Sequence, residues 1–256
     1  TASNSADSND ITQQTYKPGK LTIATGQPAY EPWVMNDKPE SGEGYEAAVA
    51  YAVADKLGFK KSDVVWTRTA FDTAIAPGAK DWDFNIQQFG ITDERKKAVD
   101  FSSSYYNDSQ SVVVKKDSKF ANATKVSDLK DATVGVMVGT LAYDYAKANI
   151  KDDIQTFNDD AALAQALDAG QIDALVTSTV ECVYMVQSEQ VKDAKVLGRL
   201  PDSEDKSGMG IVLPKDSKLT AAVTKAVDDL NADGTIKKLQ DKWLAEYTTD
   251  LTELKK

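Results

Sequence analysis

The sequence predicts an α/β protein with two lobes, each formed by a sheet flanked by helices. Strand and helix patterns alternate along most of the chain, which favours largely parallel sheets with helices on both faces. The alternation runs through two similar cycles. The length of 256 residues suffices for two modest domains, and 41% hydrophobic with 27% charged residues is typical of globular proteins.

The first cycle begins after Lys20. Short apolar or β-branched runs predict its strands, and apolar residues recur at helical spacing until Gly58, a residue type that commonly ends helices. Pro77 and Gly78 end a second, shorter helix. The predicted strands cover residues 21–25, 64–66, 82–86 and 111–115, and the predicted helices cover residues 44–57 and 71–75.

The second cycle repeats this order, and a tail follows it. Strands are predicted at residues 133–137, 154–157, 172–176, 194–197 and 210–213, and helices at 126–129, 141–148, 160–169, 180–190, 219–230 and 236–247. We expect the tail to return to the first lobe. The expected domains are therefore a first lobe of residues 19–110 plus 206–256 and a second lobe of residues 111–205. Residues 1–18 are small and polar, which predicts a disordered leader or tether.

Composition excludes several classes of function. A net charge of -10 argues against nucleic-acid binding, which needs a basic field. The chain has no His, which removes Ser-His and Cys-His catalysis and nearly every zinc or copper site. Its one cysteine, Cys182, cannot form an internal disulfide and reads as a small buried hydrophobe. There is no nucleotide-binding glycine motif, and the acidic pairs lack EF-hand spacing, so we expect neither cofactor nor metal.

The most informative stretch is the turn between a strand at residues 84–87 and a helix that starts after Thr92. Thr92 is a suitable N-cap, and acids occupy the first helical turn. This arrangement brings backbone N–H groups and the guanidinium of Arg95 to one strand-to-helix turn, where they could bind a carboxylate. The alternative is that Arg95 is an ordinary surface residue beside Lys96 and Lys97.

A similar turn, Gly139-Thr140, occurs in the second cycle. Ligands of open α/β sheets bind beyond the carboxyl ends of the strands, where both turns are expected. We therefore predict a ligand cleft between the lobes that closes on a small molecule.

The order and spacing of several motifs resemble the polar amino-acid binding proteins of ABC importers, family 3 of the solute-binding proteins. The resemblance extends over nearly the whole chain after the leader. It rests on residues 28–33 (PAYEPW), 44–46 (GYE), 91–95 (ITDER), 99–106 (VDFSSSYY), 134–140 (VGVMVGT), 170–174 (GQIDA) and 233–235 (DGT). It implies a periplasmic-binding-protein-like fold of type II and the capture of a small polar amino acid or related carboxylate.

The resemblance also implies residue roles. Arg95 would bind the ligand carboxylate, together with groups of Gln88 and Gly90 from the first lobe and of Thr140 and Leu141 from the second. Tyr30 and Phe71 would sandwich the ligand, although Phe71 could equally be core, and Trp33 could be structural. Because Thr140 would act only in the closed state, replacing it should leave the ligand-free stability nearly unchanged.

Two expected aspartates are missing. The family usually has an Asp where this chain has Ser178, and many members have another where it has Gln27. A ligand ammonium left unpaired in a closed site would cost about 3–5 kcal/mol. Glu181 could supply the charge, hydroxyls and carbonyls could bind the ammonium, or the ligand could lack an α-ammonium.

The resemblance implies a non-enzymatic, monomeric capture protein that delivers its small-molecule ligand to an ABC transporter permease. The alternatives are an enzyme on the same fold, similar to cyclohexadienyl dehydratase, and a ligand-sensing domain. No paired carboxylates suited to acid–base catalysis stand out. We expect an extracytoplasmic protein, with a lipid-anchored surface location favoured over a periplasmic one because the polar leader gives reach.

Overall fold

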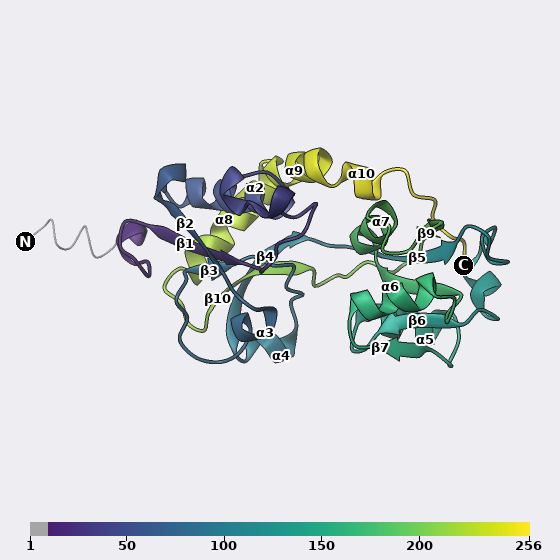
Figure 1. Cartoon of the computed structure of the whole chain (residues 1–256). Helices are drawn as coiled ribbons and strands as arrows, with labels where there is room; N and C mark the ends of the chain where they lie inside the picture. The colour runs from purple at the N-terminus through teal and green to yellow at the C-terminus, as the bar shows by residue number, and fades with distance from the viewer. Residues whose placement is uncertain (1–9) are drawn as a thin grey trace, which may run out of the picture. The chain divides into compact units, whose positions relative to one another are not determined.

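The computed structural model describes residues 10–256, which form two compact units with one sheet each (Figure 1). Of the described residues, the first unit contains 10–107 together with Ser207–Leu244, and the second contains Asp108–Lys206 with Ala245–Lys256. The predicted fold class, two lobes with a helix-flanked sheet in each, is confirmed. No helix within residues 10–256 has the length and apolar character that a membrane crossing requires.

The sheet of the first unit has the strand order β2-β1-β3-β10-β4. β1 runs parallel to β2 and β3, whereas β10 is antiparallel to both β3 and β4, so the sheet is mixed. The strands are β1 (Leu21–Thr25), β2 (Val64–Arg68), β3 (Phe84–Asn85), β4 (Val99–Tyr106) and β10 (Met209–Pro214). The helices are α2 (Tyr45–Lys56), α3 (Phe71–Ala74), α4 (Asp93–Lys96), α8 (Thr220–Ala232) and α9 (Thr235–Trp243), with short 3-10 turns at Ile11–Gln13, Met35–Asp37, Pro39–Ser41 and Lys61–Asp63.

The sheet of the second unit has the order β7-β6-β8-β5-β9. β6 pairs in parallel with β7 and β8, and β5 is antiparallel to β8 and β9. The strands are β5 (Gln110–Lys115), β6 (Val134–Met137), β7 (Gln155–Phe157), β8 (Ala174–Ser178) and β9 (Ala194–Arg199). The helices are α5 (Leu141–Asn149), α6 (Asp160–Asp168), α7 (Thr179–Gln187) and α10 (Ala245–Thr248), with a 3-10 turn at Val126–Leu129.

Helices cover both faces of the second sheet. In β5, Val112 and Val114 belong to one apolar cluster and Val113 to another. β8 alternates in the same way, with Val176 in the first cluster and Leu175 in the second. Strands buried on both faces read as continuous apolar runs, which explains why they could be recognised in the sequence.

The structure corrects the expected leader. Residues 1–9 lie outside the described part, but residues 10–18 are packed on the first unit. Asp10 caps the turn Ile11–Gln13, and Thr15 is buried. The Tyr16 amide donates to Asp83 Oδ1 at 2.7 Å. The polar composition hid this role, because the contribution of the segment is a backbone donor to a buried carboxylate rather than an apolar side chain.

The end of the chain differs from the expectation as well. The predicted helix 236–247 is divided at Leu244, and Ala245–Lys256 belongs to the second unit instead of the first. The backbone of Arg199 pairs with Thr252 and Leu254 at 2.7 and 2.8 Å, and the Leu254 side chain is buried in an apolar cluster. Tyr247 is the other buried apolar residue of this segment, and two buried apolar residues seven positions apart in a polar tail produce no periodic signal, which is why the sequence did not reveal the docking.

Candidate functional site

The turn before α4 has the geometry of an anion site. Thr92 caps the helix by accepting a hydrogen bond from the Arg95 amide at 3.1 Å, as predicted. Arg95 Nη1 donates to the Gly90 carbonyl at 2.7 Å, and the guanidinium lies 5.3 Å from the centre of the Phe71 ring. That carbonyl is the one hydrogen-bond acceptor that residues 10–256 offer the Arg95 guanidinium, so its other N–H groups can bind an anion.

Partial burial changes the electrostatics of Arg95. Desolvation lowers the pKa of its guanidinium, and the nearby Asp72 carboxylate opposes this effect. The guanidinium still carries its charge at neutral pH. A charge that is half removed from water attracts an anion more strongly than a fully solvated lysine or arginine does.

A pocket of about 260 Å³ lies in the first unit beside this turn. Three of the predicted ligand residues contribute to its wall, namely Tyr30, Phe71 and Gln88; the full lining is Thr25, Gly26, Pro28, Ala29, Tyr30, Phe71, Gln87 and Gln88. Tyr30 is 53% exposed, whereas Phe71 packs against Phe89 with ring centroids 4.7 Å apart. One aromatic wall is thus anchored in the core and the other is open to solvent.

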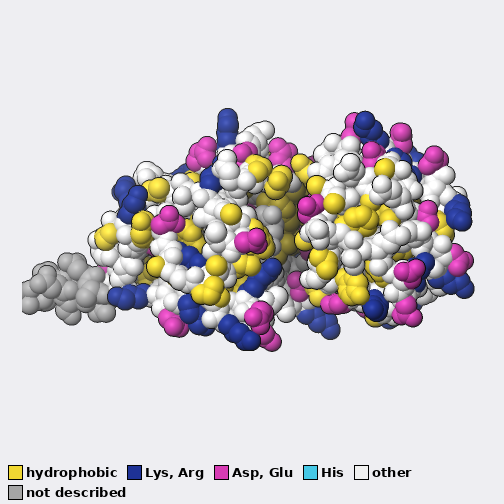
Figure 2. Space-filling view, turned by 60° about the horizontal axis from the view of Figure 1, so that its bottom comes forward, with side chains coloured by type: hydrophobic (Ala, Val, Ile, Leu, Met, Phe, Trp, Pro, Cys, Tyr) yellow, Lys and Arg dark blue, Asp and Glu magenta, His cyan; other side chains and the backbone are white. Residues whose placement is uncertain are grey.

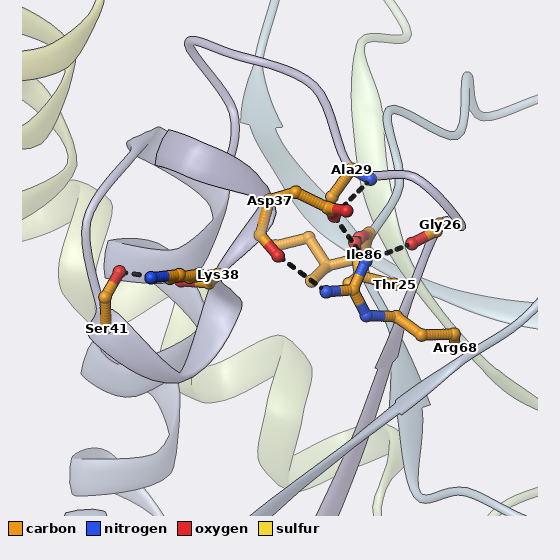
Figure 3. Close-up of polar contacts among 8 residues, drawn as sticks. All are labelled: Thr25, Gly26, Ala29, Asp37, Lys38, Ser41, Arg68 and Ile86. Carbon is orange, nitrogen blue, oxygen red and sulfur yellow. Dashed lines mark hydrogen bonds and ion pairs between the residues drawn. The ribbon is translucent and has the colours of Figure 1, made fainter.

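The loop that carries Tyr30 is fastened by an ion pair between Arg68 and Asp37 (Figure 3). Arg68 Nη1 donates to Asp37 Oδ1 at 2.5 Å and to the Gly26 carbonyl at 2.9 Å, and Nη2 donates to the Asp37 carbonyl at 2.8 Å. The same carboxylate accepts from the Ala29 amide at 2.8 Å, and this pairing with Arg68 lowers the pKa of Asp37. The loop therefore has a defined conformation next to the pocket.

Of the three glutamines near this site, Gln87 rather than Gln27 or Gln88 has a polar side-chain atom available to a ligand. Gln88 has a positive φ of 51°, and its backbone N and Nε2 both donate to Glu46, so its amide group is already occupied. Gln27 is exposed and does not line the pocket. Gln87 does line it, and its Oε1 is buried without a hydrogen-bond partner among the described residues. Sequence reasoning missed Gln87 and Glu46, because one unpaired amide oxygen or one buried acid leaves no pattern.

In the second unit, the hydroxyl of Thr140 is part of a helix cap. It accepts from the Tyr143 amide at 3.2 Å and donates to the Met137 carbonyl at 2.7 Å. Leu141 is 46% exposed, and as the first residue of α5 its amide has no acceptor within the helix. Of the two predicted donors, the Leu141 amide is the one suited to an anion.

Acidic groups gather near Ser178 and Glu181 in the second unit. Ser178 precedes α7, but its side chain makes no capping bond. Burial, with the nearby carboxylates of Asp160 and Asp108, raises the pKa of Glu181 to about 7. Burial also raises the pKa of Asp108 to about 7, against the opposing effects of three backbone donors and of Arg199. Among residues 10–256, no group of three or more His, Cys, Asp or Glu side chains is arranged to hold a metal ion.

Acidic and basic side chains are interspersed on the visible face of both units, without a broad basic surface (Figure 2). This mixture of charges accompanies the net charge of -10. Cys182 is buried and free, as predicted.

Comparison with known proteins gives consistent results. Residues 21–246 match the bacterial extracellular solute-binding proteins, family 3. The L-arginine-binding protein of Pseudomonas aeruginosa is 29% identical over 245 residues, with 90% of this chain and 88% of the relative covered. The L-cystine-binding protein TcyJ of Escherichia coli is 30% identical over 223 residues, with 86% and 81% covered.

Solved structures agree with these relatives. An ancestral arginine-binding protein bound to arginine superimposes with a TM-score of 0.64 at 31% identity, covering 88% of this chain and 98% of the other. The ancestral amino acid-binding protein AncCDT-1, described as a precursor of cyclohexadienyl dehydratase, gives 0.63 at 31% identity, with 88% and 95% covered. The fold, the match over most of the chain and these relatives together show that the chain is a solute-binding protein and belongs to family 3 of the bacterial extracellular solute-binding proteins.

Proposed function

We propose that the protein captures an amino acid with a net positive charge, of which L-arginine is the first candidate, and delivers it to an ABC importer. The observation that carries this proposal is Arg95, a half-buried guanidinium beside a pocket with aromatic walls. Its N–H groups, apart from the one that donates to Gly90, have no acceptor within residues 10–256. Such a group favours a carboxylate over neutral or cationic ligand groups.

The carboxylate of the ligand is bound, in this proposal, by the Arg95 guanidinium and the backbone of Gly90. In the second unit, the amide of Leu141 at the start of α5 is a further candidate donor, because it has no acceptor within the helix and the helix dipole also favours an anion there. Thr140 supports this amide by capping α5, and its hydroxyl is not a principal ligand group.

The positive groups of the ligand are balanced by Glu181, with Ser178 as a neighbouring hydroxyl. Three carboxylates whose pKa values are raised by burial make this part of the second unit favourable for a cation. Gln87 offers its amide oxygen, which is unpaired among the described residues, as an acceptor for the side chain of the ligand in the first unit. Relatives named for arginine binding support a cationic ligand, whereas those named for cystine support a zwitterionic one.

The test is calorimetry with L-arginine, L-lysine, L-cystine, L-glutamine and agmatine, the decarboxylated form of arginine. Arg95→Met should weaken L-arginine binding about 30-fold or more, because the charge-assisted contact of a half-buried guanidinium is lost. The same change should leave agmatine binding unaffected, since agmatine has no carboxylate. Lys97→Met is the matched control, because Lys97 is exposed and Glu94, at 3.1 Å, is its one ion-pair partner within residues 10–256. Equal loss for both ligands would refute the carboxylate assignment.

The enzyme alternative has one observation in its favour, the likeness to AncCDT-1. Mass spectrometry of the bound amino acid after prolonged incubation separates the two functions, because capture returns the ligand unchanged. Recovery of a dehydrated or decarboxylated product would replace our proposal by catalysis.

The family places the protein outside the cytoplasm. We propose that it acts as a monomer, with a lipid anchor and an ABC permease as its partner. Sedimentation of the ligand-bound protein tests the monomer, and labelling of cells with a palmitate analogue tests the anchor. A dimer in the sedimentation experiment would contradict the monomer. A protein that carries no label and is released with the soluble fraction would contradict the lipid anchor.

A further inference from the structure

Glu46 is a fully buried acid next to the ligand-binding turn of the first unit. It is the second residue of α2, and its side chain is 0% exposed. Glu46 Oε2 accepts from the Gln88 backbone N at 2.8 Å and from the Tyr105 hydroxyl, while Oε1 accepts from Gln88 Nε2. One carboxylate thus joins α2, the turn after β3 and the strand β4.

Within the described part of the chain, the Glu46 carboxylate has no compensating cation. Among residues 10–256 no Lys or Arg side chain forms an ion pair with Glu46, and hydrogen-bond donors alone stabilise its charge. A buried charge without a counterion costs several kcal/mol unless donors surround it. Burying this acid therefore costs more free energy than an apolar residue at the same position would. The groups that its hydrogen bonds hold in place are what the structure gains from it.

Two of the three donors belong to Gln88. This residue has a φ of 51°, a left-handed conformation that costs a side chain other than glycine roughly 1–2 kcal/mol. Gln88 lines the pocket, and Gly90, whose carbonyl fixes Arg95, follows two residues later. The hydrogen bonds that Gln88 donates to Glu46 therefore oppose its tendency to leave this conformation.

We infer that Glu46 is the positioning residue of the anion-binding turn: its ionised carboxylate holds Gln88 in the left-handed conformation on which the pocket wall and the orientation of Arg95 depend. This inference rests on the proposed function, because it concerns how that site is kept ready for its ligand.

Titration of Glu46 provides the readout. Burial raises the pKa of its carboxyl to about 7, although the donors from Tyr105 and Gln88 oppose this shift. The other titratable groups that face it are phenols: Tyr45 from α2 and Tyr105 from β4, whose pKa values burial raises above the ordinary value. Both phenols stay neutral near pH 7, so Glu46 is the group that changes charge. A protonated carboxyl accepts fewer hydrogen bonds, and Gln88 loses an acceptor.

The first experiment follows the Gln88 backbone amide by NMR in the ligand-free protein from pH 5 to 9. We expect its proton shift to titrate with a midpoint near 7, because the amide donates to the titrating carboxylate. Tyr105→Phe should raise this midpoint, since the lost hydroxyl lowers the pKa of Glu46. A Gln88 amide shift that does not change over this range would overturn the inference. This test on the parent protein needs neither a ligand nor a substitution in the core.

The second experiment compares L-arginine affinity of the parent and Glu46→Gln by calorimetry. At pH 8.5 the variant should bind about tenfold more weakly, because hydrogen bonds to a charged acceptor are lost. At pH 5.5, where Glu46 itself is neutral, the two proteins should bind within about twofold of each other. Glu181 and Asp108 titrate in both proteins, so their effect cancels in the ratio of the two affinities at each pH. Glu40→Gln, an exposed acid of the same unit, should show a ratio near one at both pH values.

A ratio that is the same at both pH values would refute the inference, because a merely structural defect does not depend on the ionisation of Glu46. Circular dichroism and thermal unfolding test whether Glu46→Gln is folded. If it is not, the NMR titration of the parent protein alone tests the inference. Failure of the proposed function looks different, since Arg95→Met would then bind L-arginine like the parent.

Discussion

Replacing Thr140 by Val separates helix capping from ligand binding in the second unit. Val conserves the shape of Thr but removes the hydroxyl, which accepts from the Tyr143 amide at 3.2 Å and donates to the Met137 carbonyl at 2.7 Å. Loss of an N-cap costs about 1 kcal/mol, within a range of 0.5–2. For a chain of this size, each kcal/mol corresponds to roughly 2–4 °C in the unfolding midpoint. We therefore expect the ligand-free variant to unfold a few degrees below the parent.

Differential scanning calorimetry of the ligand-free protein measures this loss, and Thr140→Ser is the matched control because serine caps helices as well as threonine does. Binding of L-arginine to Thr140→Val should weaken by less than about tenfold, since the Leu141 amide remains and only its support is lost. This expectation reverses the one from the sequence, in which a Thr140 substitution affects only the ligand-bound state. An unchanged midpoint together with a large loss of affinity would refute the capping argument and restore the hydroxyl as a ligand group.

Three further outcomes are expected. Asp83→Asn should lower the free energy of unfolding by about 1–3 kcal/mol in urea titrations, because the buried carboxylate accepts from the amides of Tyr16 and Thr22, each at 2.7 Å. Deleting the residues before Gly19 should have a comparable effect, because the Tyr16 amide is then lost. Gly208→Ala should destabilise the first unit by at least about 1–2 kcal/mol in the same assay, since φ is +75° and a Cβ would lie 2.1 Å from Ser104 Oγ. Glu181→Gln should raise the stability of the ligand-free protein more at pH 8 than at pH 5, because a carboxyl whose pKa rises to about 7 on folding contributes stability that is lost as pH increases through that value. An effect of Glu181→Gln that is equal at both pH values would contradict its burial.

Much of the fold could be predicted because its strands are buried on both faces. The run 172–176 stands out as apolar since Leu175 and Val176 enter different clusters of the second unit. The strand β4 was not predicted, because its residues 102–104 are serines. Their role is polar: Ser102 Oγ accepts from the Ile211 amide at 2.9 Å, and Ser104 Oγ donates to Asn107 Oδ1 at 3.0 Å.

The candidate site was predictable to the extent that local motifs determine it. The Thr92 cap and the placement of Arg95 follow from a few neighbouring residues, and the structure reproduces both. The environment of Gln88 depends on Glu46, 42 residues earlier in the chain, which no local pattern connects to it. Likewise, the backbone donors that hold the Asp83 carboxylate come from residues distant in sequence.

The strand order has a consequence for synthesis on the ribosome. β10 lies between β3 and β4, so the sheet beside the ligand-binding turn has a gap until residues 209–214 have been made. The second unit in turn needs Thr252 and Leu254, which pair with the backbone of Arg199. Each unit is closed by a segment from late in the chain, which gives both a high contact order and makes their folding slow. Until these segments emerge, the nascent chain exposes unpaired strand edges, which are prone to aggregation.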